Sequence, residues 1–149
     1  MNPREARRRT VDRLKGLLEV ERAAAATVAR LIPIAGGPTA GKLLEKLRDD
    51  EAWSCAGLTR VINHLGGKVS HDTGDGAQRI HAEPSLREQL PRLNRGQACV
   101  VRQLDRLLEE ELDRETGGFL RQMRSLHVEN VHLCDDLVKT LTAPDARAG

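Results

Sequence analysis

The chain has 149 residues, which is the length of one domain and enough to bury a hydrophobic core. With one Trp, one Phe and no Tyr, and with many Leu, Ala, Arg and Glu residues, its composition favours helices over sheets. A formal net charge of +2 produces no strong field, so we expect neither nucleic acid nor a membrane surface as a partner.

Apolar residues recur with the helical period of about 3.6 in four segments. The predicted helices cover about residues 8–32, 39–65, 85–114 and 119–141. Gly and Pro in the stretch PIAGGP end the first helix, and the pair Gly66-Gly67 ends the second. Ser85, with Glu88 three residues later, predicts the start of the third helix.

The lengths of the connections predict how the helices are joined. Short turns at PIAGGP and at Gly117-Gly118 make two antiparallel hairpins. The middle connection has about 17 residues and spans roughly 55 Å when extended, enough to run along a helix of about 40 Å. An all-α bundle of two hairpins joined by one long crossover has the ferritin-like arrangement, and a simple up-and-down bundle is the alternative. We expect a basic lead, the bundle and a flexible tail at residues 1–9, 10–141 and 142–149.

The stretch LHVENVH contains a Glu-x-x-His, Glu129 and His132, the spacing with which di-iron bundles hold metal. At about 100° per residue, with Met123 at the centre of the apolar stripe, these two residues fall about 120° and 180° away from that centre. His127 and Asn130 fall within about 40° of it. The apparent motif is therefore expected to face solvent, and His127 and Asn130 to face the core.

The other three predicted helices also direct polar side chains into their apolar stripes. These residues are Glu21 on the first helix, Glu51 and Ser54 on the second, and Gln97 on the third. Each lies near the midpoint of its helix, so we expect one polar layer across the bundle. Burying two carboxylates without a cation is costly, and the layer therefore requires a metal ion, a protonated His127 or a shared proton.

Several longer stretches carry a resemblance to a known group of proteins. They are EVERAAAATVARL, LRDDEAWSCAGLTRVINHLGG, SHDTGD, LPRLNRGQACVVRQL and Met123-x-x-x-His127-x-x-Asn130-Val131. Together they cover about residues 14–137 and resemble small bacterial proteins of the ferritin-like superfamily whose function is uncharacterised. The resemblance implies a ferritin-like fold and no particular activity. The chain departs from that group at Gly76-Ala77-Gln78-Arg79, where an aromatic-rich stretch is typical.

The wider superfamily's di-iron pattern is only partly present. Glu21 and Glu51 match it, and the remaining ligand positions are occupied by Ser54, Gln97, His127 and Asn130. This degenerate pattern argues against a two-metal centre. It leaves a site for a single Fe, Mn or Zn ion, with Glu21, Glu51 and His127 as candidate ligands. The other candidates, Ser54, Gln97 and Asn130, would surround those ligands or bind weakly.

Two functional hypotheses remain open. In the first, the protein acts through structure, interaction or weak metal binding, and its polar layer is a closed hydrogen-bond network that fixes helix register. In the second, it is a mononuclear Fe- or Mn-dependent oxidoreductase. No catalytic residue can be assigned from the sequence.

The remaining features concern partners and location. Trp53 is expected on an outer face, as a homodimer contact or as an ordinary exposed side chain. Cys134 is expected in the core, and the three cysteines form no close pair, which argues against a disulfide framework. A surface metal near the crossover histidines His64, His71 and His81 is a minor alternative. Without a long apolar stretch or a signal-like N-terminus, a cytoplasmic location is expected.

Overall fold

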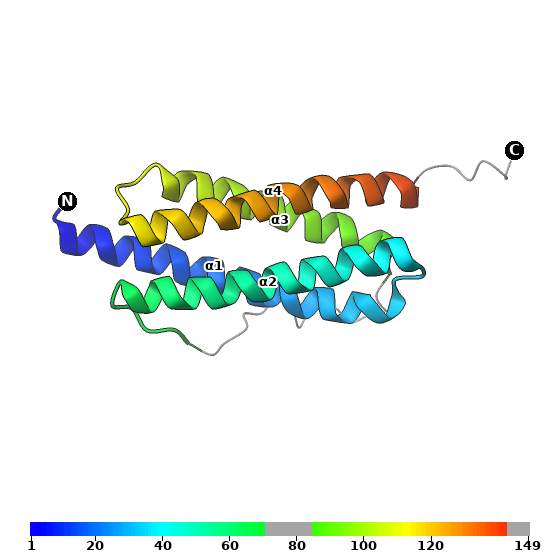
Figure 1. Ribbon diagram of the computed structural model, residues 1–149, viewed down its shortest axis with the longest axis horizontal. Helices are drawn as coiled ribbons and strands as arrows, with labels where there is room; N and C mark the ends of the chain where they lie inside the picture. The colour runs from blue at the N-terminus through cyan, green and yellow to red at the C-terminus, as the bar shows by residue number, and fades with distance from the viewer. Residues whose placement is uncertain (71–84, 143–149) are drawn as a thin grey trace, which may run out of the picture.

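The computed structural model describes residues 1–70 and 85–142, and within them the chain forms helices and no strands. The helices are α1 (Pro3–Leu31), a 3-10 turn η1 (Ile32–Ile34), α2 (Pro38–His64), α3 (Leu86–Leu108) and α4 (Arg114–Thr142). They pack as a four-helix bundle, which confirms the predicted fold class (Figure 1).

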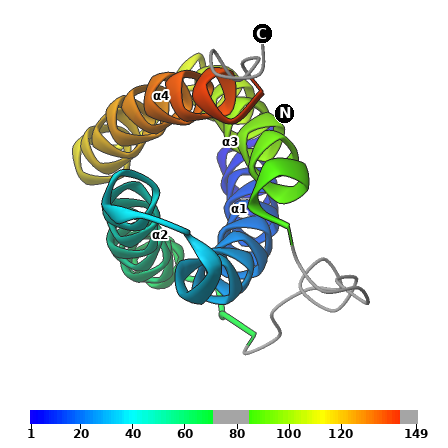
Figure 2. The same ribbon diagram turned by 90° about the vertical axis from the view of Figure 1, so that its right-hand side faces the viewer.

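The order of the helices around the bundle axis is α1, α2, α4, α3 (Figure 2). The sequential pairs α1–α2 and α3–α4 pack most closely and form the two antiparallel hairpins. In Figure 1, α2 ends at the left of the bundle, whereas α3 begins at the right, so these two helices run in the same direction. This excludes the simple up-and-down alternative.

The first helix begins earlier than predicted. Asn2 precedes Pro3 and caps the helix, since its side-chain oxygen Oδ1 accepts a hydrogen bond from the backbone N–H of Glu5 at 2.9 Å. The basic residues from Arg7 to Arg9 therefore lie on exposed helical turns. Most of the expected basic lead over residues 1–9 is thus helical, because the Asn2 cap and a proline at the first helical position start α1 at Pro3.

The turn between α3 and α4 also differs from the prediction. It covers residues 109–113, and Gly117-Gly118 lies inside α4. Asp113 caps α4, because its Oδ2 accepts a hydrogen bond from the backbone N–H of Thr116 at 3.1 Å. The prediction of a turn at Gly117-Gly118 is wrong, because the Asp113 cap starts α4 before these glycines. They lie in its first turns, where glycine is tolerated.

The apolar core consists of two clusters, one toward each end of the bundle. The first includes Leu18, Leu58, Val100 and Met123, among others, and the second includes Val28, Leu47, Leu93 and Cys134, among others. Every helix passes from one cluster to the other at its polar interior residues. The predicted polar layer is thereby confirmed, as is the burial of Cys134.

Some sequence predictions fall on the part of the chain that the structure does not describe. His71, His81 and the tail over residues 143–149 lie outside the described residues. Within the described ranges, no helix combines the length and the apolar composition that a membrane span requires.

Candidate metal centre

Three of the four long helices bring a potential metal ligand to the middle of the bundle. Glu21 comes from α1, Glu51 from α2 and His127 from α4, and each offers a ligand atom within 4.8 Å of the others. All three side chains are at most 2% exposed. The predicted trio thus forms one buried cluster, which no single stretch of sequence contains.

The hydrogen bonds of His127 fix which ring nitrogen faces the cluster. Nδ1 lies 2.9 Å from the backbone carbonyl oxygen of Met123, and because a carbonyl cannot donate, the Nδ1 proton must be donated to it. Nε2 lies 3.0 and 3.1 Å from the two carboxylate oxygens of Glu21, and 3.8 Å from Oε1 of Glu51. Two states of the ring are compatible with these contacts. Either Nε2 also carries a proton and donates it to Glu21, or Nε2 is unprotonated and its lone pair binds a cation that Glu21 also binds.

The two carboxyl groups cannot both be ionised easily at this depth. Burial, together with the hydrogen bond to Glu21 and the negative charge of Glu21, raises the pKa of Glu51 to about 10. Burial also raises the pKa of Glu21, opposed by the hydrogen bond that Glu51 provides. Without a metal ion, one proton therefore stays on the pair at neutral pH, held mainly by Glu51.

Several oxygen atoms of the polar layer lack a hydrogen-bond partner. They are Oε2 of Glu51, Oγ of Ser54 and Oε1 of Gln97, and all three are buried. Leaving a buried polar atom unpaired costs about 1–3 kcal/mol. An ion bound at Glu51 would give Oε2 a partner, so the donor set fits a small cation better than it fits an empty interior.

The residues predicted to surround the ligands are partly turned elsewhere. Gln97 directs its amide nitrogen toward Oδ1 of Asn94 and Sγ of Cys134, each at 3.5 Å. Asn130 donates to Oδ2 of Asp50 at 2.9 Å. Both side chains are nearly fully buried, as predicted, but their described hydrogen bonds lead away from the carboxylate pair.

One cation that contacts the polar layer, Lys46, was not predicted from the sequence. Lys46 donates to Oδ1 of Asn130 at 2.8 Å and to Oδ2 of Asp50 at 2.7 Å. Its Cα lies beside the apolar stripe of α2, and its long side chain reaches inward from there. The spacing of Lys46 and Asp50, four residues apart and next to Glu51, was the available signal.

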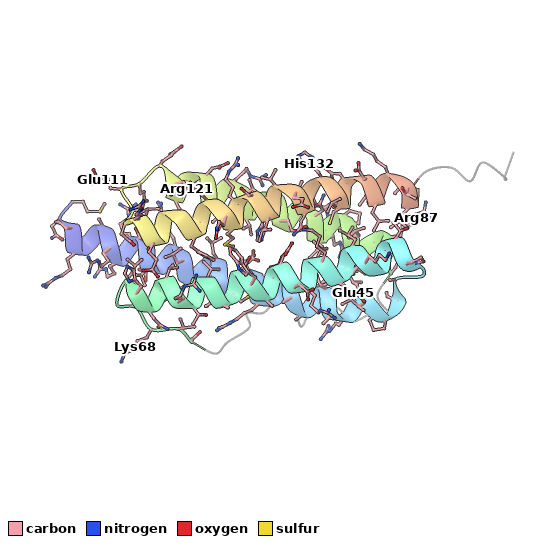
Figure 3. All side chains as sticks on the ribbon, in the orientation of Figure 1. Glu45, Lys68, Arg87, Glu111, Arg121 and His132 are labelled. Carbon is pink, nitrogen blue, oxygen red and sulfur yellow. The ribbon has the colours of Figure 1, made fainter. Side chains whose placement is uncertain are left out.

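The outward-facing residues behave as the helical wheel predicts. Glu129 and His132 are exposed, and Figure 3 shows His132 pointing away from the bundle. His64 lies on the surface, 3.2 Å from Asp113 and 3.5 Å from Glu115, where it joins the end of α2 to the start of α4.

Trp53 occupies an intermediate position. It is 39% exposed, and its ring packs on Phe119 with the ring centroids 5.1 Å apart. The side chain of Phe119 lies directly over Gly57, where a Cβ atom would come within 1.9 Å of it. Trp53 therefore covers the edge of the core, and part of its surface remains available for a contact.

Fold and site together define an all-α four-helix protein with a buried Glu–Glu–His cluster. Residues 8–136 match a protein family described as Domain of unknown function (DUF6306), and the chain belongs to this family. No curated protein and no solved structure matches the chain significantly.

Proposed function

We propose that the protein binds one divalent ion of iron, manganese or zinc between Glu21, Glu51 and His127. The observation that carries this proposal is the orientation of His127. Its Nδ1 proton is committed to the carbonyl of Met123, and Nε2 faces both oxygens of Glu21. A backbone acceptor on the far nitrogen is a common way to orient a histidine that binds metal through the near one.

The chemistry of the donor set supports the same proposal. Two carboxylates and one imidazole suit Fe(II), Mn(II) and Zn(II), and they place two negative charges where one divalent ion would neutralise them. Three protein ligands leave coordination positions for further groups. With iron or manganese, the ion would supply one-electron redox chemistry, and the protein would then be an oxidoreductase. The residues of the chain hold the ion and keep bulk water away.

A second candidate is a structural bundle without metal. The observation that favours it is the burial of Glu51 beside Glu21, which raises the pKa of Glu51 to about 10, so a retained proton already removes one charge from the pair. His127 then donates to Glu21, and Glu51 hydrogen-bonds to the same carboxylate, which joins the three helices in one network. Such a network would fix the register of α1, α2 and α4.

Kinship with ferritin-like bundles belongs to the same proposal. It is supported by the two hairpins, by the parallel α2 and α3, and by the positions of Glu21 and Glu51. We also propose a cytoplasmic homodimer, supported by the exposed apolar side chains of Val20 on α1 and Ile34 on η1. Light scattering coupled to size exclusion should give about twice the chain mass of 16.5 kDa, and a monomer mass would contradict the dimer.

The metal proposal is tested by elemental analysis of protein purified without chelator from cells supplemented with iron and manganese. We expect about one metal ion per chain, lost in Glu51→Ala. Glu45→Ala is the matched control, because Glu45 lies on the same helix and points to solvent (Figure 3). A wild-type protein without metal, together with a folded Glu21→Leu variant of equal or higher stability, would contradict metal binding and leave the structural candidate.

A further inference from the structure

The candidate metal centre is closed to solvent, so an ion requires a route into it. A row of polar side chains leads inward along the α2–α4 seam, which is the line where α2 meets α4. Side-chain exposure falls along it from 57% at Glu129 to 33% at Lys46 and 18% at Asp50. Asn130 follows at 1%, one helical turn from His127. Asp50 is the sequence neighbour of Glu51, and its negative charge helps to raise the pKa of Glu51, so the inner end of this row of side chains lies near the proposed ligands.

Three of these polar residues, Lys46, Asp50 and Asn130, are joined pairwise by hydrogen bonds. The ammonium of Lys46 donates to both Asp50 and Asn130, and the amide of Asn130 donates to the same oxygen of Asp50. Lys46 also lies 3.7 Å from Oε1 of Glu129, on the solvent side. We define Lys46, Asp50 and Asn130 as the seam triangle. Its ammonium has two sets of partners, one inside the seam and one at the surface.

Two open grooves flank the seam triangle. One has a volume of about 640 Å³, and Asp49, Asp50 and Trp53 contribute to its wall. The other has a volume of about 480 Å³ and includes Lys46 in its wall. The α2–α4 seam is less closely packed than either hairpin, because these helices belong to different hairpins. A cation can therefore approach the triangle from solvent beside two carboxylates.

We propose that the seam triangle is the entry gate for the metal ion, and that Lys46 is its movable part. In the closed state, the Lys46 ammonium fills the position of a cation between Asp50 and Asn130 and repels an approaching divalent ion. When the ammonium moves to Glu129, the freed oxygens of Asp50 and Asn130 receive the ion and pass it to Glu51. The flexible four-carbon stem of lysine permits this displacement. The inference rests on the proposed metal-binding function.

The test follows the binding of Co²⁺ to metal-free protein by stopped-flow absorbance, with release measured after addition of a chelator. Lys46→Met should raise both the association and the release rate about tenfold, with one Co²⁺ per chain still bound at saturation. Asp50→Asn should slow association by a similar factor. Lys139→Met is the matched control, because Lys139 is exposed on α4 and lines neither groove, and its rates should stay within about twofold of wild type.

The outcomes separate the gate from the metal site itself. If Co²⁺ binds with the same rates in wild type and Lys46→Met, the gate is overturned and the proposed metal site stands. If wild type binds no Co²⁺ at all, the proposed function is overturned and the gate with it. Circular dichroism checks folding, and Lys46→Gln replaces Lys46→Met if the latter does not fold.

Discussion

Nε2 of His127 lies 3.0 and 3.1 Å from the two oxygens of Glu21, although these residues are 106 positions apart in the chain. Both side chains are buried, and the opposite ring nitrogen is held by the backbone of Met123. The imidazole therefore has little freedom to rotate. This contact between α1 and α4 is the structural basis for the proposed site, and it gives the first prediction.

Replacing His127 by alanine should destabilise the metal-free protein by about 3–5 kcal/mol, because it leaves the buried carboxylate of Glu21 without its partner. Urea unfolding followed by circular dichroism measures the change. His132→Ala is the control on the same helix, and we expect it to stay within about 0.5 kcal/mol of wild type, since His132 is exposed. Equal effects of the two substitutions would contradict the assigned role of His127.

The metal-free protein should lose stability as pH rises from about 5 to 9. Glu51 titrates near 4.5 in the unfolded chain, and burial raises its pKa to about 10 in the folded protein. Between these two values the folded state binds more protons than the unfolded state. The contribution of protonated Glu51 to the free energy of unfolding is therefore complete below pH 4.5 and is lost as pH rises towards 10. The free energy of unfolding should fall by up to about 1.4 kcal/mol for each pH unit.

Unfolding free energies of chelator-treated protein, measured across this pH range, check that prediction. Glu51→Gln keeps the shape and cannot ionise, so its stability should depend less on pH than that of wild type. Glu45→Gln on the exposed face of the same helix should follow the wild-type curve. A wild-type stability that rises over the same range would reverse the sign and refute the retained proton.

Replacing the whole cluster with Glu21→Leu, Glu51→Leu and His127→Leu should give a folded protein that binds no metal. Without metal, at pH 8, we expect it to be at least as stable as wild type, because apolar side chains often replace buried ionic groups with a gain of about 1–4 kcal/mol. Thermal unfolding of both proteins after chelation measures the difference. A triple variant that does not fold would show that the polar layer is needed to specify the bundle.

Gly57→Ala should destabilise the protein by about 1–3 kcal/mol, because its Cβ would collide with the ring of Phe119. The displaced ring would also shift Trp53, whose fluorescence reports the change because it is the only Trp in the chain. Gly96→Ala is the control. That position is exposed on α3 with open space around it, and alanine there should stabilise the helix by about 0.5–1 kcal/mol.

The helical wheel located the interior polar residues because burial in a long amphipathic helix follows a fixed period. Glu21, Glu51 and His127 were found in this way, and the outward position of Glu129 was found with them. The ends of helices were less predictable. Asp113 caps α4 through a local side-chain geometry that competes with the nearby glycines, and periodicity carries no information about that competition.

The sequence by itself determined four helices, the two hairpins and the height of the polar layer, because these depend on local periodicity and on connection length. The tertiary structure alone decided which polar groups touch. It paired His127 with Glu21, turned Asn130 toward Lys46 and Asp50, and left Oε2 of Glu51 unpaired. These contacts depend on how each helix is rotated about its axis and on long side chains that cross between helices. The spacing of residues along a single helix does not determine distances between side chains on different helices.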